Sequence, residues 1–297
     1  MAWLLDAPDL LSPNSPRWEG KIATLAVDFS TTKSWLEQLD RNPESLQRYL
    51  GTVPISRLGR YAEKLLAFYL DWRGVLLHHG LQVNNDAHQT IGEFDFLLKE
   101  SNRLIHWEFA TKFYLFEGEG QPPGDDQFVG PNLADTLGAK MQKILHRQLA
   151  LGRHPAASCY LDQPIVQAQA LIRGWLFYRE AQYRDVDNEI SGVNPNHCRG
   201  FWCTASEFAA LEAEAFLMLP RLAWLAPAQV SSATVLDRPT MNRLIESHFM
   251  SDPMPLLIAL MAVSGDLAAE VGRGFIVPDD WRARAGERRQ RSVLAHG

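Results

Sequence analysis

Three charged residues lie at spacings that suit metal-dependent hydrolysis. Asp95 lies in the segment GEFDFLL, and Glu108 and Lys112 lie in HWEFATKFYL, which follows after a short polar link. Hydrolysis of a phosphodiester with Mg²⁺ or Mn²⁺ needs carboxylate oxygens that converge on the ion. It also needs a cation near the attacking water or the developing charge. We therefore predict a metal site that includes Asp95 and Glu108, with Lys112 orienting or helping to deprotonate the water.

The segment that carries Asp95 has the pattern of a β-strand. Its residues alternate strictly, so a regular strand places Glu93, Asp95 and Leu97 on one face. The opposite face then carries Phe94, Phe96 and Leu98.

A second strand is predicted over residues 104–115, where Glu108 and Lys112 have an even offset and so share a face. The link KESNR predicts a hairpin turn near Asn102, which brings Asp95 and Glu108 together. The alternative is that these are solvated charges on an exposed face, which only keep a strand soluble.

Two helices are predicted around these strands. The first covers 57–77, and the second covers 132–151 with Asn132 as its N-cap. A weak strand signal at 80–85 and a clearer one at 168–178 complete the order helix, three strands, helix, strand. This order predicts an α/β protein with a mixed central sheet flanked by helices. The apolar stripe of the first helix is Leu58, Ala62, Leu65, Tyr69, Trp72 and Leu76.

The rest of the chain is predicted to elaborate this core. Residues 1–56 form an N-terminal helical elaboration, 57–179 the core, and 180–297 a C-terminal elaboration packed on the core. Within the last part, 206–219 has a helix-like pattern. The basic run at 282–297 is predicted to be a flexible tail.

The order of the predicted elements and their motifs resemble the PD-(D/E)XK nuclease superfamily. GEFDFLL is similar to its Gly-x-x-Asp element and HWEFATKFYL to its Glu-x-Lys element. The resemblance covers 57–179 and implies a restriction-endonuclease-like core that binds Mg or Mn. It departs at Ala110, which stands where the lysine is expected. Lys112 is displaced by two residues, about 7 Å along a regular strand.

The same resemblance implies roles for two helical residues. Glu63 resembles an acidic residue that these nucleases carry on the first helix beside the metal, and Gln142 resembles a glutamine on the second helix. The alternatives are a charge at the edge of a buried helix for Glu63 and a surface amide for Gln142.

A closer resemblance spans most of the chain. PDLL near the start, the GEFDFLL and HWEFATKFYL pair, and RGFIVPDDW near the end are similar to an uncharacterised bacterial domain-of-unknown-function family, number 1853.

Nucleic-acid binding has to rest on local charge, because the net charge of the chain is −6. Lys140, Lys143 and Arg147 form a basic stripe that suits phosphate contacts, with a solvated helix face as the alternative. The Arg-rich tail offers weak nucleic-acid affinity or only solubility. DNA is the expected partner of an active enzyme, and a protein partner or homo-oligomer remains open. The tail arginines are Arg282, Arg284, Arg288, Arg289 and Arg291.

The sequence favours a cytoplasmic protein. It has no apolar run of the length that a membrane helix needs, and the first residues lack the pattern of a secretory signal. The leading functional hypothesis is a Mg²⁺- or Mn²⁺-dependent nuclease acting on DNA. The rival is a nuclease-fold protein that lost activity and serves as a binding or scaffolding protein.

Overall fold

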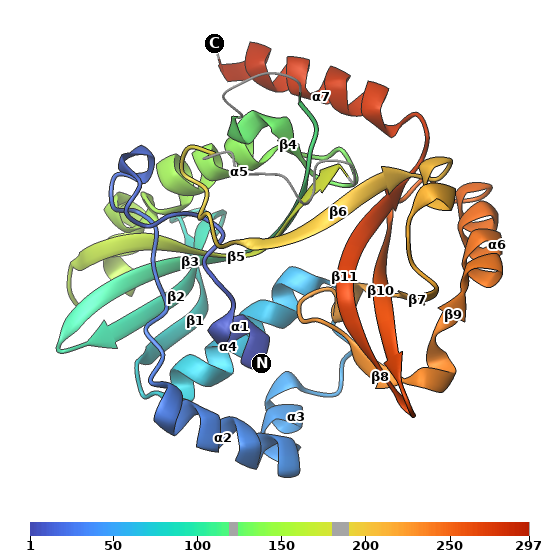
Figure 1. The fold of residues 1–297 in the computed structure, drawn as a ribbon. Helices are drawn as coiled ribbons and strands as arrows, with labels where there is room; N and C mark the ends of the chain where they lie inside the picture. Colours follow the sequence, from blue (N-terminus) through green and yellow to red (C-terminus); the bar gives the residue numbers. More distant parts are fainter. Residues whose placement is uncertain (119–123, 180–189, 297) are drawn as a thin grey trace. The chain divides into compact units, whose positions relative to one another are not determined.

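A mixed α/β fold, with both parallel and antiparallel strand pairs, is seen in the computed structural model, which describes residues 1–118, 124–179 and 190–296 (Figure 1). The chain divides into two compact units, and the division falls within strands β3 and β5 and helix α5. The stretch predicted as the core therefore contributes residues to both units. Unit 1 comprises Met1–Lys112, Met141–Arg173 and Gly192–Asn196, and unit 2 comprises Phe113–Lys140, Gly174–Ser191 and His197–Gly297.

The sheet of unit 1 has the strand order β1-β2-β3-β5. The strands β1 and β2 are antiparallel, and so are β2 and β3. The predicted hairpin turn between β2 and β3 is confirmed. Ser101 and Asn102 both have positive φ, 48° and 64°, as a two-residue type I′ turn requires. These strands are β1 (Leu76–Asn84), β2 (Thr90–Glu100), β3 (Arg103–Phe116) and β5 (Ile165–Arg179).

The predicted alternation of faces along β2 does not extend to burial. Phe94 and Leu97, which alternation places on opposite faces, belong to one hydrophobic cluster with Val83 and Leu104. Consecutive residues from Phe96 to Leu98 are buried, so both faces of the strand are covered there. A strand covered on both sides loses the simple pattern of one apolar and one polar face.

The first predicted helix is shorter in the structure than in the sequence analysis. α4 covers Leu58–Trp72 and packs beside β1 (Figure 1). Its predicted stripe is buried as far as Tyr69, whereas Trp72 is 40 % exposed. Gly74, with φ of 67°, follows the helix end, and β1 already begins at Leu76. Residues from Leu76 on, which have a helical pattern, therefore form a strand because they pair with β2.

The second predicted helix is also shorter, and its cap is different. α5 covers Leu137–Lys143 and is followed by a π-helical turn, η3 (Ile144–Gln148). The Ala139 N–H donates to Thr136 Oγ1 at 3.2 Å, so Thr136 caps the helix, and the prediction of Asn132 is wrong. Residues on the π-turn are rotated relative to an α-helical register, which matters for the site below.

Helices near the N-terminus belong to unit 1. The Asp28 side chain accepts from the Ser30 N–H and caps α2. Trp35 of α2 stacks on Trp72 of α4, with ring centroids 4.5 Å apart. The N-terminal helices are α1 (Ala2–Asp6), α2 (Phe29–Arg41) and α3 (Glu44–Leu50).

No helix within the described ranges is long and apolar enough to cross a membrane.

The sheet of unit 2 follows the order β5-β6-β11-β10-β7-β9, with β4 paired to β3 and β8 to β11. Its pairs β5–β6 and β6–β11 are parallel, while β10–β11 and β7–β10 are antiparallel. The sheet is therefore mixed, as predicted. Its strands are β4 (Phe128–Val129), β6 (Cys198–Thr204), β7 (Ala215–Met218), β8 (Gln229–Ser231), β9 (Leu236–Asp237), β10 (Leu256–Ser264) and β11 (Leu267–Val277).

The helix predicted over 206–219 is wrong. The segment forms a short 3₁₀ turn, η7 (Glu207–Ala210), and then the strand β7, which pairs with β10. Phe208 and Phe216 both enter the core cluster of unit 2 beside α6 (Arg238–Phe249). Tertiary burial overrides the local helical pattern here. Further 3₁₀ turns are η1 (Pro16–Trp18), η2 (Asp125–Gln127), η4 (Leu151–Arg153), η5 (Pro155–Tyr160), η8 (Arg221–Ala223) and η9 (Ser232–Thr234).

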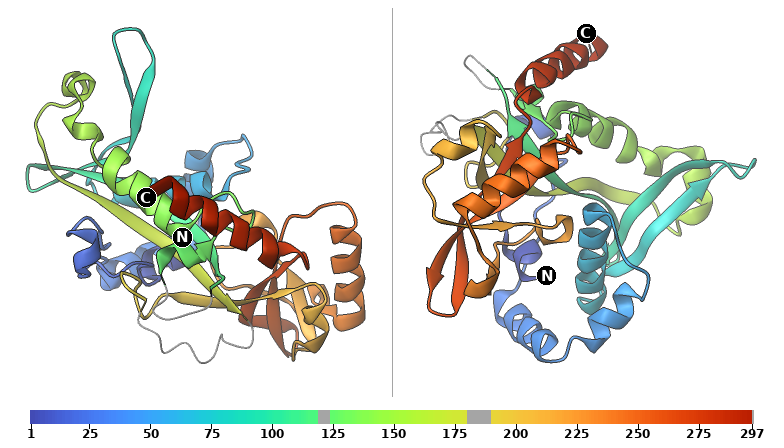
Figure 2. Two further views of the ribbon diagram at one scale, coloured as in Figure 1. Left: turned by 90° about the horizontal axis from the view of Figure 1, so that it is seen from above. Right: turned by 90° about the vertical axis from the view of Figure 1, so that its right-hand side faces the viewer.

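The basic C-terminal run is a helix, α7 (Trp281–His296), and the prediction of a flexible tail is wrong (Figure 2). α7 lies beside β4 in unit 2. Trp281 is buried and donates from Nε1 to the Pro131 carbonyl at 2.7 Å, while Arg288 donates to the Ala134 carbonyl. These contacts anchor the run. The side chain of Arg291 and residue Gly297 lie outside the described part.

Candidate metal centre

Three carboxylates of unit 1 converge on one point. Glu63, Glu93 and Asp95 each offer one oxygen, and these oxygens lie within 4.8 Å of one another. Glu63 comes from α4, and the other two come from β2. Asp95 and Glu63 were predicted as metal ligands, whereas Glu93 was not. The signal for Glu93 was present, because it lies two residues before Asp95 and so on the same side of a strand.

Each of these carboxylates is held by a donor from outside the cluster. The bonds run from His79 Nε2 to Glu63 Oε1 (2.8 Å), from Gln82 Nε2 to Glu93 Oε2 (3.2 Å) and from the Phe109 N–H to Asp95 Oδ2 (2.9 Å). Both side-chain donors lie on β1. Hydrogen bonds of this kind fix the direction of a ligand carboxylate before an ion binds.

Asp95 has the most perturbed electrostatics of the cluster. Burial raises its pKa to about 8, and the nearby charges of Glu108 and Glu63 act in the same direction. The Phe109 N–H, which donates to the carboxylate, opposes the shift. Without a cation, the Asp95 carboxyl therefore holds a proton at neutral pH. A bound cation reverses this balance, because it favours the ionised carboxylate.

Glu108 lies beside this cluster and is fully buried. It is 1 % exposed, so it is not the solvated surface charge of the alternative hypothesis. The β2–β3 register, continued by one residue past its last pair, puts Asp95 opposite Glu108. Glu108 Oε1 accepts from His106 Nε2 at 2.8 Å, and Oε2 accepts from Gln148 Nε2. Glu108 is not part of the group of three within 4.8 Å, and its ligand role stays a prediction.

Two polar side chains contact Glu108, the buried His106 and the half-buried Gln148. Burial lowers the pKa of His106 to about 4, so its imidazole is neutral and donates to the carboxylate through Nε2. Within the described residues, the buried atoms His106 Nδ1 and Gln148 Oε1 have no hydrogen-bond partner. Two hydrogen-bond acceptors therefore lie unsatisfied next to the carboxylate.

The two glutamines of the second helical segment lie in different environments. Gln142, the residue predicted to assist the site, has an exposed side chain. Gln148 lies on the π-turn and reaches Glu108. Sequence reasoning placed both on one long helix, and neither the true helix start nor the π-turn is visible in the sequence. A direct role for Gln142 stays a prediction.

The predicted basic residues differ in how far they are exposed to solvent. Lys112 is half-buried on β3, four residues after Glu108. Lys143 and Arg147 are exposed, and Lys140 is half-buried. Their roles in catalysis and phosphate binding stay predictions.

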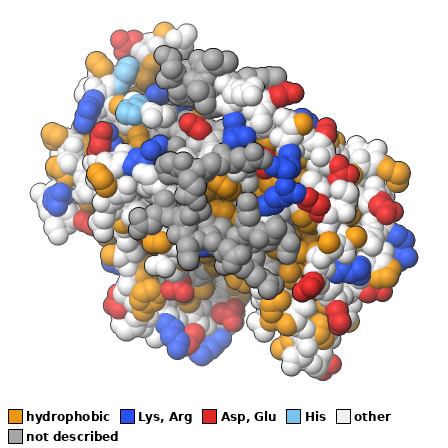
Figure 3. Space-filling model, turned by 45° about the horizontal axis from the view of Figure 1, so that its top comes forward, with side chains coloured by type: hydrophobic (Ala, Val, Ile, Leu, Met, Phe, Trp, Pro, Cys, Tyr) orange, Lys and Arg blue, Asp and Glu red, His pale blue; other side chains and the backbone are white. Residues whose placement is uncertain are grey.

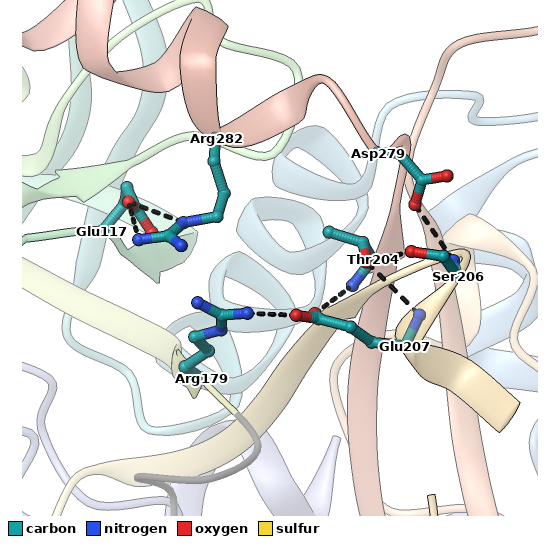
Figure 4. A network of polar contacts seen from close by, with 7 residues as sticks. All are labelled: Glu117, Arg179, Thr204, Ser206, Glu207, Asp279 and Arg282. Carbon is teal, nitrogen blue, oxygen red and sulfur yellow. Dashed lines mark hydrogen bonds and ion pairs between the residues drawn. The ribbon is translucent and has the colours of Figure 1, made fainter. Parts of the chain in front are cut away.

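A second cluster of charged residues, in unit 2, has a structural explanation (Figure 4). Thr204 and Glu207 form two reciprocal hydrogen bonds at the start of η7. The Thr204 N–H donates to Glu207 Oε2, and the Glu207 N–H donates to Thr204 Oγ1. Arg179 pairs with the other oxygen of Glu207. Arg282 of α7 donates to Glu117 at 3.0 Å. These hydrogen bonds and ion pairs hold the turn η7 and the helix α7 in place.

Comparison with known proteins adds one finding. A family model described as "Domain of unknown function (DUF1853)" matches residues 1–277. The chain belongs to this family. The match confirms the closer of the two resemblances found in the sequence. The match covers the elements that carry Glu63, Glu93 and Asp95, and it ends at the last residue of β11, before α7. No curated protein and no solved structure matches the chain.

Proposed function

We propose that this DUF1853 protein is a Mg²⁺- or Mn²⁺-dependent nuclease that hydrolyses phosphodiester bonds in DNA. The convergence of Glu63, Glu93 and Asp95 carries the proposal. An all-oxygen ligand set suits hard cations such as Mg²⁺ and Mn²⁺. The raised pKa of Asp95 supports it, because crowded and buried carboxylates are strongly stabilised by a cation.

In the proposed mechanism, Glu63, Glu93 and Asp95 would hold the ion. When bound, the ion supplies Lewis-acid polarisation of the phosphate and a more acidic water. Lys112 orients the attacking water and offsets the developing charge. Glu108, fixed by its two hydrogen bonds, adds negative charge next to Asp95.

Two further observations support a PD-(D/E)XK-like core. The observed order α4, β1, β2, β3, α5, β5 agrees with the order predicted for such a core, apart from the short strand β4. In addition, two residues implied by that resemblance, Glu63 and Asp95, share one cluster. A cytoplasmic, bacterial nuclease that contacts DNA phosphates through Lys143 and Arg147 completes the proposal.

One observation favours the second candidate, a nuclease-fold binding or scaffolding protein without activity. Ala110 stands where a catalytic lysine is expected. On the face drawn in Figure 3, Lys and Arg side chains lie among acidic and hydrophobic ones, so its described atoms form no continuous basic surface. Affinity for DNA then rests on a few contacts and is sensitive to salt.

A cleavage assay tests the proposal. Purified full-length protein with Mn²⁺ or Mg²⁺ is incubated at low salt with single strands, duplexes, flaps and branched junctions. We expect cleavage of at least one substrate, lost in Asp95→Ala and Glu63→Gln. The control Glu100→Gln, exposed on the same strand as Asp95, retains activity. No Mn²⁺ binding and no cleavage overturns the proposal, while Mn²⁺ binding without cleavage favours the scaffold.

A further inference from the structure

The outer contacts of the carboxylate cluster point to a residue that neither resemblance singled out. We infer that His79 is a positioning residue, which sets the metal affinity of the cluster by holding the Glu63 carboxylate in place. The inference rests on the proposed function, because it concerns the same site. It adds a residue on β1 to a site otherwise built from α4 and β2.

The His79–Glu63 contact is short and shielded. Nε2 and Oε1 are 2.8 Å apart, and the two side chains are only 23 % and 24 % exposed. With its proton on Nε2, the imidazole donates to the carboxylate. Glu63 has a long side chain with several rotamers, so fixing one of its oxygens removes freedom that ion binding otherwise has to remove.

The His79 ring is itself immobilised. It stacks on Phe96, with centroids 5.3 Å apart and an interplanar angle of 13°. Phe96 is fully buried and pairs with His79 in the β1–β2 register. Because stacking fixes the His79 ring, its Nε2 points in a fixed direction and holds the Glu63 carboxylate in one orientation.

His79 acts from outside the set of ligand atoms. A histidine nitrogen counts as a ligand atom, yet His79 does not belong to the described group within 4.8 Å, which contains three carboxylates. It therefore contacts Glu63 without being one of the three residues of the group. Loss of such an outer contact typically weakens metal binding by about 10- to 100-fold.

The backbone of β1 supports this arrangement at Gly80, the residue after His79. Gly80 has φ of 66°, and a Cβ there would lie 3.5 Å from Glu93 Oε1. A glycine thus permits the unusual backbone beside the cluster. Gln82, two residues on, makes the longer and exposed contact to Glu93, so we expect a smaller effect from its loss.

Three variants separate donation from packing. His79→Phe keeps an aromatic ring for Phe96 but has no donor, and His79→Leu lacks the donor without the ring. His79→Gln keeps a donor and loses the ring. His78→Phe, at the exposed neighbouring histidine of the same strand, is the matched control. Three measurements are made on each full-length protein. They are the Mn²⁺ affinity by calorimetry, the electron paramagnetic resonance spectrum of bound Mn²⁺, and the thermal unfolding temperature without metal.

We expect His79→Phe and His79→Leu to weaken Mn²⁺ binding by about tenfold or more, and His79→Gln and His78→Phe to stay within about threefold of the parent. A purely structural role predicts a lower unfolding temperature with unchanged Mn²⁺ affinity. That result, or a His79→Gln protein as weak as His79→Phe, overturns the inference. If Asp95→Ala abolishes Mn²⁺ binding while every His79 variant binds normally, only this inference fails. If the parent protein binds no Mn²⁺, the proposed function fails with it.

Discussion

Asp95→Asn should make the metal-free protein more stable while it destroys the metal site. The amide has nearly the size of the carboxyl and keeps an oxygen to accept from the Phe109 N–H. It removes the ability to ionise, which burial and the neighbouring carboxylates disfavour in the folded protein. A residue that lowers the stability of the metal-free fold is expected at a functional site.

The magnitude follows from the pKa. The Asp95 pKa is about 8 in the folded protein and about 3.9 in an unfolded chain. Because the folded pKa is the higher one, the folded state binds one more proton between these values. The free energy of unfolding therefore falls by about 1.4 kcal/mol per pH unit as pH rises through this window. The total is at most about 5 kcal/mol at pH 8, and none of it remains below about pH 4.

Urea unfolding with chelator present measures the effect. We expect Asp95→Asn to be more stable than the parent, by an amount that grows from pH 5 to pH 8. Mn²⁺ at 100 times its dissociation constant should narrow this difference, because it stabilises only the parent, by about 2.7 kcal/mol. Asp86→Asn, exposed between β1 and β2, is the control. Parallel curves of stability against pH for parent and Asp95→Asn would refute the reasoning.

Three further outcomes follow from the contacts. Glu93→Gln should weaken Mn²⁺ binding by more than about tenfold, and unchanged binding in calorimetry would remove Glu93 from the site. Gln148→Leu takes a donor from the buried Glu108 and should lower the free energy of unfolding by about 2 kcal/mol in urea, which equal stability would contradict. Arg273 is 1 % exposed and donates to Glu270 from two nitrogens. Arg273→Lys loses this two-point contact and should lower the free energy of unfolding by about 3 kcal/mol. An unchanged thermal midpoint would count against this.

Local signals were sufficient for the hairpin and for part of the site. Ser101 and Asn102 lie in a polar link between two apolar segments, and such a link predicts a turn without knowledge of the rest of the chain. Period-two spacing likewise put Glu93 and Asp95 on one side of a strand. These features depend on neighbours in sequence, so the sequence carries them directly.

Helix ends and the C-terminal part depended on distant contacts. The residues after Trp72 carry a helical pattern but pair with β2, and β7 has a helical pattern but pairs with β10. The Arg-rich run looks like a solvated tail, yet Trp281 finds a carbonyl 150 residues away. Propensity is weak compared with the burial of aromatic side chains, so these elements could not be predicted locally.

The sequence by itself determined which residue types the site has to work with: two acids on β2, an acid on the preceding helix, and a lysine displaced from its expected place. Only the tertiary structure decided which carboxylates meet. Glu93 joins Glu63 and Asp95 because α4 packs beside β1, the strand that pairs with β2. Glu108 is held by His106 and by Gln148 on a π-turn. The physical reason is that the direction of a side chain along one strand follows from a fixed period. The distance between carboxylates on different elements follows from packing, which the whole chain sets.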